Sequence, residues 1–571
     1  MKNQMVADVL YQIADLLDLK GEIFFKTRAY RMAAQTIEVL DEDIEDVVKE
    51  DRLKEIPGIG DAISKKIKEL VETGKLEYFE ELKKEIPEGL LKMLNISGLG
   101  PKKVAAMYKE LGIETIEQLR KACLDGEVRN LEGFGELTER NILRSIQLME
   151  KTSGRVLLNV AHEDGSKYLE YLKKNKKIDR LDLAGSFRRK KETIGDLDIL
   201  VSSKHPNDVM EYFVKYEDVD RILMQGATKS SVILNDQLQV DLRVVEEKSY
   251  GAALQYFTGS KEHNVKMRSL AIKKGFKLNE YGLFNKKTEK YIVGKNEEEI
   301  YKKLGLSYIE PELRENRGEI ESASNNKLPK LVDYNDIKGD LHVHSNMSDG
   351  DETIETMANS AKKLGYQYVG IADHSQSLKI ARGLSEDRVI KKIKEIEKIN
   401  KKHDKFRILC GTECDIKSDG TLDYSNKILK MFDFVILGIH TSFRMDKKQA
   451  TERIIKGMEN ENANILAHPT CRILMRREPF EIDMDKIFDV ARETNTYLEI
   501  NSFPDRLDLN DLHAKQAKDK KVKFSINTDA HNINHLNFLK YGVATARRGW
   551  LEKQDILNTK SIKEIEKLFG L

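Results

Sequence analysis

The sequence contains few of the residues that would place it in several common classes of protein. Its 571 residues include only 4 cysteines, too few and too scattered for a disulfide framework or an all-cysteine zinc site. No apolar run approaches the roughly 18 residues that a membrane helix needs, and we find no secretory hydrophobic segment. We therefore expect a cytoplasmic protein with reduced thiols and no membrane association.

An excess of charge of either sign is also missing. The 97 Lys and Arg residues nearly balance the 96 Asp and Glu residues, which leaves a net charge of +1. Binding to nucleic acid would therefore depend on local basic patches. The chain is too long for a single hydrophobic core, and at about 150 residues per domain it indicates about three to five domains.

Histidine, by contrast, is concentrated in the last third of the chain, where 9 of the 12 lie between residues 340 and 540. Ligand-type side chains there accompany short apolar runs typical of β-strands, with helical sequence between the runs. These side chains are His342, His344, Asp349, His374, Glu413, His440, His468, Asp529 and His531. Because parallel strands end at one face of a β/α barrel, the pattern predicts a polynuclear metal site and a metal-dependent hydrolase.

Other histidines and cysteines of this region stand outside the pattern. A single histidine is more often a packed core residue, and three of them lack a strand-end setting, so we interpret them as structural or surface residues: His403, His513 and His535. Cysteines near the proposed ligands are interpreted as buried thiols. From about residue 336 onward we count seven candidate strands, one short of an eight-fold barrel.

A Gly-x-Gly pattern occurs three times near the amino terminus, in IPGIGDAISKKI (56–67), ISGLGPKKVAAM (96–107) and LEGFGELTERNI (131–142). Each copy opens a helical stretch, where outward-facing amides make a pocket for a phosphate anion. The pattern resembles the helix-hairpin-helix motif, which binds the DNA backbone without reading its sequence. One copy alone is equally typical of an ordinary helix–helix turn, and the third, with no lysine nearby, is expected to be structural. The predicted DNA contacts are Gly58, Gly60, Gly98, Gly100 and Lys102.

A pair of carboxylates in GDLDIL suggests a second kind of metal site. Asp196 and Asp198 are two residues apart on an expected strand, which places both on one face, roughly 6.5–7 Å apart at Cα. Asp241 on another strand would complete a site for two divalent ions of the kind used in phosphoryl transfer. Taken alone, Asp-x-Asp is as typical of a solvent-facing edge strand.

Neighbouring residues favour the catalytic interpretation. In GSFRRKKETIGDLD, Gly185 and Ser186 lie at a strand-to-helix turn that suits a triphosphate, with Arg188 and Arg189 beside it. The stretch resembles the nucleotidyltransferase signature. QYFTGSKEHNVKMRSLAIKKGFKLNEYGLF (255–284) resembles the thumb of family X DNA polymerases, and the amino-terminal stretches resemble that family's lyase domain. The resemblance covers residues 1–318.

That resemblance implies particular roles. Asp196 and Asp198 would bind two Mg2+ ions, with Asp241 on the ion that activates the primer hydroxyl. Tyr256 and Phe257 would lie against the sugar. The triphosphate contacts would be Gly185, Ser186, Arg189, Gly259 and Ser260, whereas Asn264 would reach the new base and Arg268 the templating side. Packing within the thumb is the alternative for the two aromatic residues.

The lyase activity of the family is less well supported by the residues. Lys66 stands at the position of the Schiff-base lysine and Lys26 at that of a phosphate-contacting one. However, Ala62 replaces a further lysine, which makes the pocket less basic. A lysine on a helix surface is usually only solvated, since Schiff-base chemistry needs a depressed pKa.

The last 235 residues or so resemble the PHP (polymerase and histidinol phosphatase) domain. The family's trinuclear pattern finds a suitable residue at every position. The first ion would bind His342, His344, Glu413 and Asp529; the second Glu413, His440 and His468; the third Asp349, His374 and His531. Mixed nitrogen and oxygen ligands suit Mn2+ or Zn2+, up to three ions, better than Mg2+ alone.

We therefore expect a multidomain protein with a helical helix-hairpin-helix amino terminus, an α+β nucleotidyltransferase palm and thumb, and a distorted (β/α)7 PHP barrel. The expected segments are a lyase-like domain (1–88), a fingers-type domain (89–150), palm (151–248), thumb (249–318), linker (319–335) and PHP domain (336–571).

The expected function is a DNA polymerase that fills short gaps in DNA repair, including base excision repair. A metal-dependent 3′–5′ exonuclease would occupy the barrel, with abasic-site cleavage as a further candidate activity. Its partners would be gapped or primer-template DNA and deoxynucleoside triphosphates, and we expect a monomer. The alternative is a PHP nuclease or phosphoesterase whose polymerase half mainly holds DNA.

Overall fold

The computed structural model describes residues 2–571 except positions 23, 39, 41, 95, 97, 98, 236 and 444. The chain forms two compact units, residues 1–153 with 475–478 and residues 154–474 with 479–571. Gly98, one of the predicted DNA contacts, lies outside the described residues. Within the described residues, no helix combines the length and apolar character that a bilayer crossing requires.

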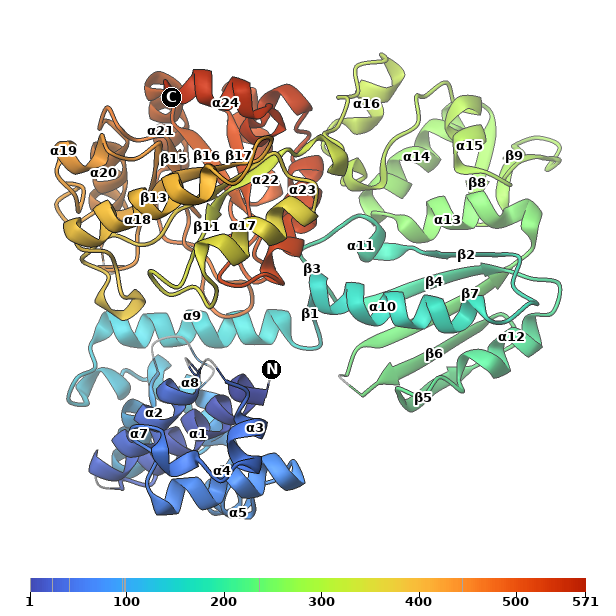
Figure 1. The fold of residues 1–571 in the computed structure, drawn as a ribbon. Helices are drawn as coiled ribbons and strands as arrows, with labels where there is room; N and C mark the ends of the chain where they lie inside the picture. Colours follow the sequence, from blue (N-terminus) through green and yellow to red (C-terminus); the bar gives the residue numbers. More distant parts are fainter. Residues whose placement is uncertain are drawn as a thin grey trace. The chain divides into compact units, whose positions relative to one another are not determined.

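The first unit is helical (Figure 1). One cluster of buried apolar side chains extends from Val6 to Ile146, so the two segments expected at 1–88 and 89–150 share a single core. In the first helix, Val6, Leu10, Ile13 and Leu17 are buried at the three- and four-residue spacing of one helix face. The helices are α1 (Lys2–Leu19), α2 (Phe24–Glu38), α3 (Ile44–Lys49), α4 (Asp61–Thr73), α5 (Glu77–Glu85), α6 (Glu88–Met93), α7 (Pro101–Leu111), α8 (Ile116–Leu124) and α9 (Glu136–Thr152).

The second unit begins with the palm, a five-stranded sheet of order β2-β4-β7-β6-β5 in which only β4 and β7 are parallel. The strands of this sheet are β2 (Arg180–Leu183), β4 (Asp196–Ser202), β5 (Val219–Gln225), β6 (Lys229–Leu234) and β7 (Gln239–Val245). Two short strands, β1 (Val156–Leu157) and β3 (Thr193–Ile194), pair separately. The helices of the palm are α10 (Leu158–Lys173), α11 (Gly185–Arg188) and α12 (Pro206–Phe213). Edge strand β5 is not apparent from the sequence, because apolar and polar residues do not alternate along it. Its three consecutive apolar residues, Ile222, Leu223 and Met224, are all exposed.

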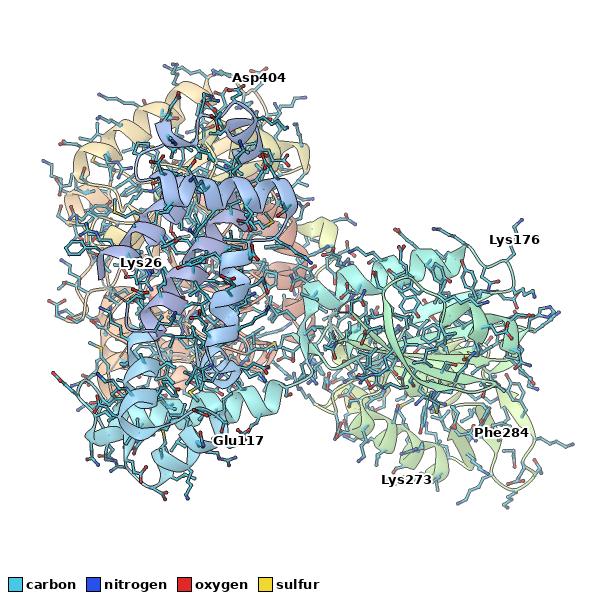
Figure 2. All side chains as sticks on the ribbon, turned by 90° about the horizontal axis from the view of Figure 1, so that it is seen from below. Lys26, Glu117, Lys176, Lys273, Phe284 and Asp404 are labelled. Atoms are coloured by element: carbon cyan, nitrogen blue, oxygen red, sulfur yellow. The ribbon has the colours of Figure 1, made fainter. Side chains whose placement is uncertain are left out.

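The thumb follows, marked by Lys273 and Phe284 in Figure 2. It comprises α13 (Tyr250–Thr258), α14 (Lys261–Lys273), β8 (Phe276–Asn279), β9 (Gly282–Asn285), β10 (Tyr291–Val293), α15 (Glu297–Lys303) and α16 (Glu319–Ser324). Helix α16 corrects part of the linker expected at 319–335. Ile320 and Ala323, three residues apart, bury one face of α16 in the thumb core, so this segment is folded despite its polar composition.

The remainder is a barrel of seven parallel strands in sequence order, as expected. A bridge between Val343 and Ala530 brings the first and last strands together, so the barrel is nearly closed. The strands are β11 (Gly339–Val343), β12 (Tyr368–Ile371), β13 (Arg407–Asp415), β14 (Phe434–Gly438), β15 (Ile465–Leu466), β16 (Tyr497–Asn501) and β17 (Phe524–Asn527). The helices are α17 (Ile354–Lys363), α18 (Glu386–Asn400), α19 (Asn426–Leu429), α20 (Lys447–Met458), α21 (Met484–Thr494), α22 (Asp511–Asp519), α23 (Leu539–Arg548) and α24 (Ile562–Phe569).

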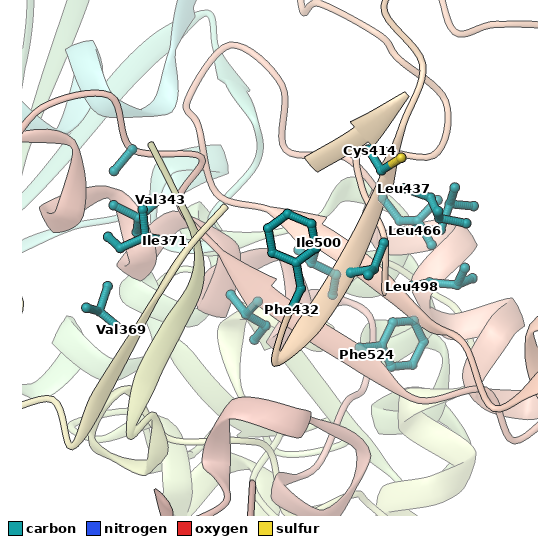
Figure 3. Close-up of a cluster of buried hydrophobic side chains, with 14 of the residues drawn as sticks. Val343, Val369, Ile371, Cys414, Phe432, Leu437, Leu466, Leu498, Ile500 and Phe524 are labelled. Carbon is teal, nitrogen blue, oxygen red and sulfur yellow. The ribbon is translucent and has the colours of Figure 1, made fainter. Parts of the chain in front are cut away.

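Alternate residues of the barrel strands pack into two cores. In β14, Val435 and Leu437 join a cluster between the strands and the surrounding helices, whereas Phe434 and Ile436 join a smaller cluster with Ile565 of α24. All seven strands contribute to the larger cluster shown in Figure 3. The smaller cluster therefore fills the barrel interior.

Glycine makes room for this interior packing. A Cβ at Gly370 or Gly411 would lie only 2.5 or 2.2 Å from the Phe434 ring. Glu413 stands two residues after Gly411 in β13, so it continues the same inward face beyond the apolar layer. The barrel interior is thus apolar around Phe434 and carries ligand-type side chains towards the carboxyl ends of the strands.

A buried ion network joins the palm to the thumb. The carboxylate of Glu297, 4% exposed, accepts hydrogen bonds from Arg188 at 2.9 and 2.6 Å and from Arg314 at 2.6 Å. Burial alone would raise the pKa of Glu297, but the two guanidinium groups hold it at about 2. Arg314 is fully buried, so its charge depends on this carboxylate.

We predict that Glu297→Gln lowers the free energy of unfolding by about 3 kcal/mol at pH 7, because it leaves the Arg314 charge without a counter-ion. The folded-state pKa of Glu297 is depressed, so its contribution is complete above about pH 4.5 and is lost as the pH falls towards 2. The free energy of unfolding of the variant should therefore change less between pH 4.5 and 2 than that of the unmodified protein. Trp550, the single tryptophan, packs against the thumb core, and its fluorescence in urea reports unfolding. Exposed Glu298→Gln on the same helix is the control; equal stability of the two variants would refute the prediction.

Candidate active sites

The three carboxylates predicted for the palm lie on its one parallel strand pair. Asp196 and Asp198 are two residues apart on β4, and Asp241 on β7 is the register partner of Asp198. Lys229 Nζ lies 3.0 Å from one oxygen of Asp241, and Gln239 donates to the other at 2.8 Å. The structure thus brings the three carboxylates together on adjacent strands.

Burial and mutual repulsion set the charge of this triad. Burial raises the pKa of Asp198 to about 7, and the charges of Asp196 and Asp241 add to the effect. Burial and Asp241 likewise raise the pKa of Asp196. Although burial acts on Asp241 too, hydrogen bonds from Gln239 and Lys229 bring its pKa below the ordinary value. Divalent cations would relieve this repulsion, so an all-oxygen donor set of this kind fits Mg2+.

Gly185 brings the backbone directly against the triad. Its φ is +61°, and a Cβ there would lie 2.1 Å from Oδ2 of Asp198. Only glycine leaves room for the carboxylate at this turn. Half-buried Ser186 follows it in α11, so the predicted triphosphate turn lies beside the predicted metal ligands.

The two arginines after this turn have different surroundings. Arg188 is bound by Glu297 and Thr258 and faces the thumb. Arg189 donates through Nε to Glu315 at 3.0 Å and through Nη1 to the Thr258 carbonyl. Among the described residues, Nη2 of Arg189 has no hydrogen-bond partner. Arg189 therefore keeps one terminal guanidinium nitrogen for a ligand, whereas both terminal nitrogens of Arg188 are bound by Glu297.

The turn between α13 and α14 lies against Arg189. Gly259 has a φ of +72°, and a Cβ there would lie 3.0 Å from Nη1 of Arg189. Ser260 caps α14 by accepting a hydrogen bond from the His263 amide at 3.2 Å. The structure therefore places the predicted triphosphate residues of palm and thumb side by side.

The other predicted nucleotide contacts are engaged within the thumb. The rings of Tyr256 and Phe257 meet edge to face at 5.1 Å. The side chain of Asn264 donates to the Tyr256 carbonyl and accepts from Gln255, both at 2.7 Å. Arg268 is half-buried one turn further along α14. Contacts of these residues with a nucleotide or template remain predictions.

The nine predicted ligands of the barrel lie together around Glu413. Its Oε2 is 3.3 Å from His342 Nε2, 3.6 Å from His344 Nε2 and 3.1 Å from His374 Nδ1. Its Oε1 is 3.2 Å from His440 Nε2 and 3.1 Å from His468 Nε2. The two oxygens of one carboxylate thus face two separate groups of imidazoles, as a bridging ligand would.

The remaining ligands complete the cluster. Asp529 Oδ1 is 3.1 Å from His344 Nε2. Asp349 Oδ2 lies 3.4 Å from His374 Nε2 and 3.5 Å from His531 Nε2. His344 also approaches Asp349 through its other ring nitrogen, at 3.7 Å. Two ligands lie within strands, His342 in β11 and Glu413 in β13; the others follow the strands, and all gather at one end of the barrel.

Several of these atoms are buried without a hydrogen bond. Within the described part of the chain, they are His342 Nε2, both ring nitrogens of His344, His374 Nδ1, His468 Nδ1 and Glu413 Oε2. Buried polar atoms without partners are costly in a folded protein. Mixed imidazole and carboxylate donors converging on the same space fit transition-metal ions, which would satisfy these atoms.

Charge is strongly redistributed within this cluster. Although burial opposes ionisation, His440, His342 and His374 hold the pKa of Glu413 well below its usual range. Despite burial, Glu413 and Asp415 raise the pKa of His440 to about 10. His344, with mainly imidazole neighbours, has its pKa lowered by burial to about 4.

Two further carboxylates orient the ligands and were not predicted. Glu499 in β16 accepts from His342 Nδ1 at 2.8 Å and from the His468 amide at 2.8 Å. Asp415 lies 2.9 Å from His440 Nδ1. Such carboxylates fix the tautomer of a metal-binding histidine. The available signal was a carboxylate inside an apolar strand, as in YLEIN, with the period-two spacing of Glu413 and Asp415.

The three histidines and the cysteines that were not predicted to bind metal have other surroundings. His513 and His535 pack against aromatic rings, and His403 contacts Phe406. All four cysteines are buried as thiols, and burial raises the pKa of the Cys410 thiol to about 12.

In the helical unit, the second glycine of each Gly-x-Gly pattern is the residue before a helix. Gly60 precedes α4, Gly100 precedes α7 and Gly135 precedes α9. Gly58 has a φ of +89°. Amides at these helix starts suit phosphate groups. Lys102 lies in the first turn of α7.

The predicted lyase lysines are engaged with neighbouring side chains. Lys66 Nζ lies over the Tyr78 ring, 4.4 Å from its centroid, and 3.5 Å from the Ala62 carbonyl. Lys26, labelled in Figure 2, donates to Glu22 at 3.0 Å, which raises its pKa. Lyase activity therefore stays a prediction.

Four parts of the chain match known protein families. Residues 1–76 match a helix-hairpin-helix domain and residues 90–147 a SAM-like helix-hairpin-helix tandem. Residues 253–315 match the DNA polymerase beta thumb, and residues 340–503 match the PHP domain.

Similarity to one curated protein extends over nearly the whole chain. The DNA polymerase/3′-5′ exonuclease PolX of Bacillus subtilis (strain 168) is 40% identical over 568 residues, 99% of each chain. The chain belongs to the bacterial family X DNA polymerases that carry a PHP domain. DNA polymerase lambda of Rattus norvegicus is 27% identical over 300 residues, 46% of this chain and 48% of its own length. A protein of Thermoanaerobacter sp. (strain X514) named "Probable phosphatase" is 29% identical over 232 residues, 38% of this chain and 89% of its own length.

Protons should compete with Mg2+ for the palm, because Asp198 has a pKa of about 7. We expect the Mg2+ concentration for half-maximal primer extension to rise about ten-fold per pH unit below 7 and to level off above about pH 8. Mg2+ titrations of primer extension between pH 6 and 9 measure this half-saturating concentration. The Asp198→Asn variant gives the background rate. A half-saturating concentration that stays constant over this range would contradict the expectation.

Glu499→Gln should weaken metal binding to the barrel about 10–100-fold, because an amide holds the His342 ring and its tautomer less firmly than a carboxylate does. Mn2+ binding to the purified variant can be measured by equilibrium dialysis. Glu493→Gln, an exposed carboxylate on α21, serves as the matched control. Equal Mn2+ affinity of the two variants would rule out an orienting role for Glu499.

Proposed function

We propose that the chain is a DNA-directed DNA polymerase that fills short gaps during DNA repair and a metal-dependent 3′–5′ exonuclease. The observation that carries this proposal is the presence of two separate and complete ligand sets in one chain, the carboxylate triad of the palm and the nine-residue cluster of the barrel. Its substrates would be gapped or primer-template DNA and deoxynucleoside triphosphates. The Bacillus subtilis relative, named DNA polymerase/3′-5′ exonuclease PolX, supports the two activities.

In the palm, Asp196, Asp198 and Asp241 would hold two Mg2+ ions. Bound ions of this kind stabilise the attacking and leaving oxygens of an in-line phosphoryl transfer. Gly185 and Ser186 would present backbone amides and a hydroxyl to the triphosphate. Arg189 of the palm would contact it through Nη2, and Gly259 and Ser260 would contact it from the thumb side.

In the helical unit, Gly58, Gly60, Gly98 and Gly100 would present amides to DNA phosphates, with Lys102 adding a positive charge.

In the thumb, Tyr256 and Phe257 would position the nucleotide sugar, Asn264 the base and Arg268 the template. The amide of Asn264 makes one hydrogen bond at each end, so a second N–H and a second lone pair would serve that contact.

In the barrel, up to three Mn2+ or Zn2+ ions would be bound, one by His342, His344, Glu413 and Asp529, one by Glu413, His440 and His468, and one by Asp349, His374 and His531. Ligand atoms of His374 also lie close to those of Glu413 and His440, and those of His344 close to those of Asp349. Bound cations lower the pKa of a water molecule and neutralise charge on the phosphodiester during hydrolysis. Glu413 would contribute one oxygen to each of two ions. Glu499 and Asp415 would keep the His342 and His440 rings oriented.

Hydrolysis of small phosphomonoesters is a second candidate for the barrel, because of its likeness to the Thermoanaerobacter protein. Turnover of p-nitrophenyl phosphate and of a single-stranded oligonucleotide by the same preparation distinguishes the two. A strong preference for the monoester would favour the phosphatase.

One experiment tests both proposed activities. A 5′-labelled primer on a gapped template is incubated with and without nucleotides, in Mg2+ or Mn2+. We expect Asp198→Asn to abolish growth of the primer but not its shortening, and Glu413→Gln to abolish shortening but not growth. Extension by Asp198→Asn at the rate of the unmodified protein would refute the palm assignment, and undiminished shortening by Glu413→Gln would refute the barrel assignment. Full exonuclease rates with Mg2+ alone would contradict the separate metal preferences.

A further inference from the structure

Two arginines, one from the palm and one from the barrel, share a single carboxylate of the thumb. Glu315 Oε1 accepts from Nε of Arg189 at 3.0 Å and from Nη1 of Arg548 at 3.0 Å. The same nitrogen of Arg548 also lies 2.6 Å from the carbonyl oxygen of Arg189. Arg548, at the end of α23, is only 4% exposed. It therefore contacts both the backbone of Arg189 and the counter-ion of its side chain.

The barrel side of this contact is fixed by Asp511. Its Oδ2 accepts from Nη2 of Arg548 at 2.6 Å and from Nη1 of Arg317 at 3.0 Å. Although burial opposes ionisation, the two guanidinium groups lower the pKa of Asp511 to about 2. Arg548 is thus held between Asp511 and Glu315, which leaves its guanidinium little freedom to move.

This arrangement affects what Arg189 offers to a ligand. Its Nε and Nη1 are bound by Glu315 and the Thr258 carbonyl, which leaves Nη2 as the donor for a phosphate. Glu315 alone would neutralise Arg189 and repel a triphosphate. With Arg548 and its neighbours present, three guanidinium groups (Arg189, Arg548 and Arg317) face the two carboxylates of Glu315 and Asp511, and a net positive charge remains.

We propose that Arg548 of the barrel is a positioning residue for the polymerase site. Through Glu315 and the backbone of Arg189, it fixes the guanidinium that receives the triphosphate of the incoming nucleotide, and it offsets the charge of Glu315. This inference rests on the nucleotide-binding role proposed for Arg189. It implies that the barrel supports nucleotide binding in the palm through direct contact.

The alternative is that Arg548 only holds the barrel against the rest of the unit. The neighbouring Arg547 offers a matched control, because it pairs with Glu312 of the thumb segment at 2.7 Å and donates to the Val332 carbonyl at 3.0 Å. No hydrogen bond between Arg547 and either Arg189 or Glu315 occurs among the described residues. Arg547→Gln therefore removes a similar contact without the link to Arg189.

Steady-state incorporation of one nucleotide into a gapped substrate tests the proposal. We expect Arg548→Gln to raise KM for the nucleotide about five-fold and to change kcat less than about two-fold. Arg547→Gln should change neither by more than about two-fold. Primer shortening without nucleotides should be the same in both variants, which shows that the barrel is intact. Arg548→Lys, which keeps the charge but not the forked geometry, should give an intermediate KM.

A double-mutant cycle identifies the route of the effect. In a Glu315→Gln background, Arg548→Gln should change KM less than about two-fold, because the charge that it offsets is gone. Full additivity would overturn the proposal, as would a KM for Arg548→Gln equal to that of Arg547→Gln, or an equal loss of polymerase and exonuclease activity in both Arg548 variants. The Arg189→Ala variant distinguishes a failure of the proposed nucleotide role of Arg189 from a failure of the inference about Arg548. If it leaves KM unchanged, the nucleotide role of Arg189 is wrong; if it raises KM and Arg548→Gln does not, only the present inference is wrong.

Discussion

Ionisable groups that the backbone holds close together without enough partners are the constraint on which both sites depend: carboxylates repel one another in the palm, and ring nitrogens lack hydrogen bonds in the barrel. In the palm, Asp198 is the register partner of Asp241 and lies against Gly185, where even a methyl group would clash with its carboxylate. In the barrel, several buried ring nitrogens around Glu413, including both of His344, have no hydrogen-bond partner among the described residues. Neither arrangement is favourable by itself. Both become favourable when divalent cations supply the missing charge and ligation.

The two sites use parallel strands in different ways. The palm places its carboxylates near the start of β4 and on its neighbour β7, the one parallel strand pair of that sheet. The barrel places its predicted ligands at the carboxyl ends of six of its seven parallel strands, beyond an apolar interior packed around Phe434. Short carboxylates on adjacent strands suit a hard ion such as Mg2+, and imidazoles from many strands suit softer ions.

Much of this arrangement follows from the sequence. Period-two spacing placed Asp196 and Asp198 on one face, and strand-end patterns identified the barrel ligands. The carboxylates that orient them were harder to find, because Glu499 lies inside an apolar strand and its partner His342 is 157 residues away. Chain order also fails to separate Arg188 from Arg189: they are adjacent, yet one faces Glu297 and the other Glu315. Such differences depend on tertiary contacts that no local pattern encodes.

The most direct test of the account is anomalous scattering from crystals grown with Mn2+ and an unreactive nucleotide analogue. The account predicts peaks between Asp196, Asp198 and Asp241, and up to three further peaks among the barrel ligands, with Glu413 between two of them. A barrel without any peak, or ions bound away from these side chains, would contradict it.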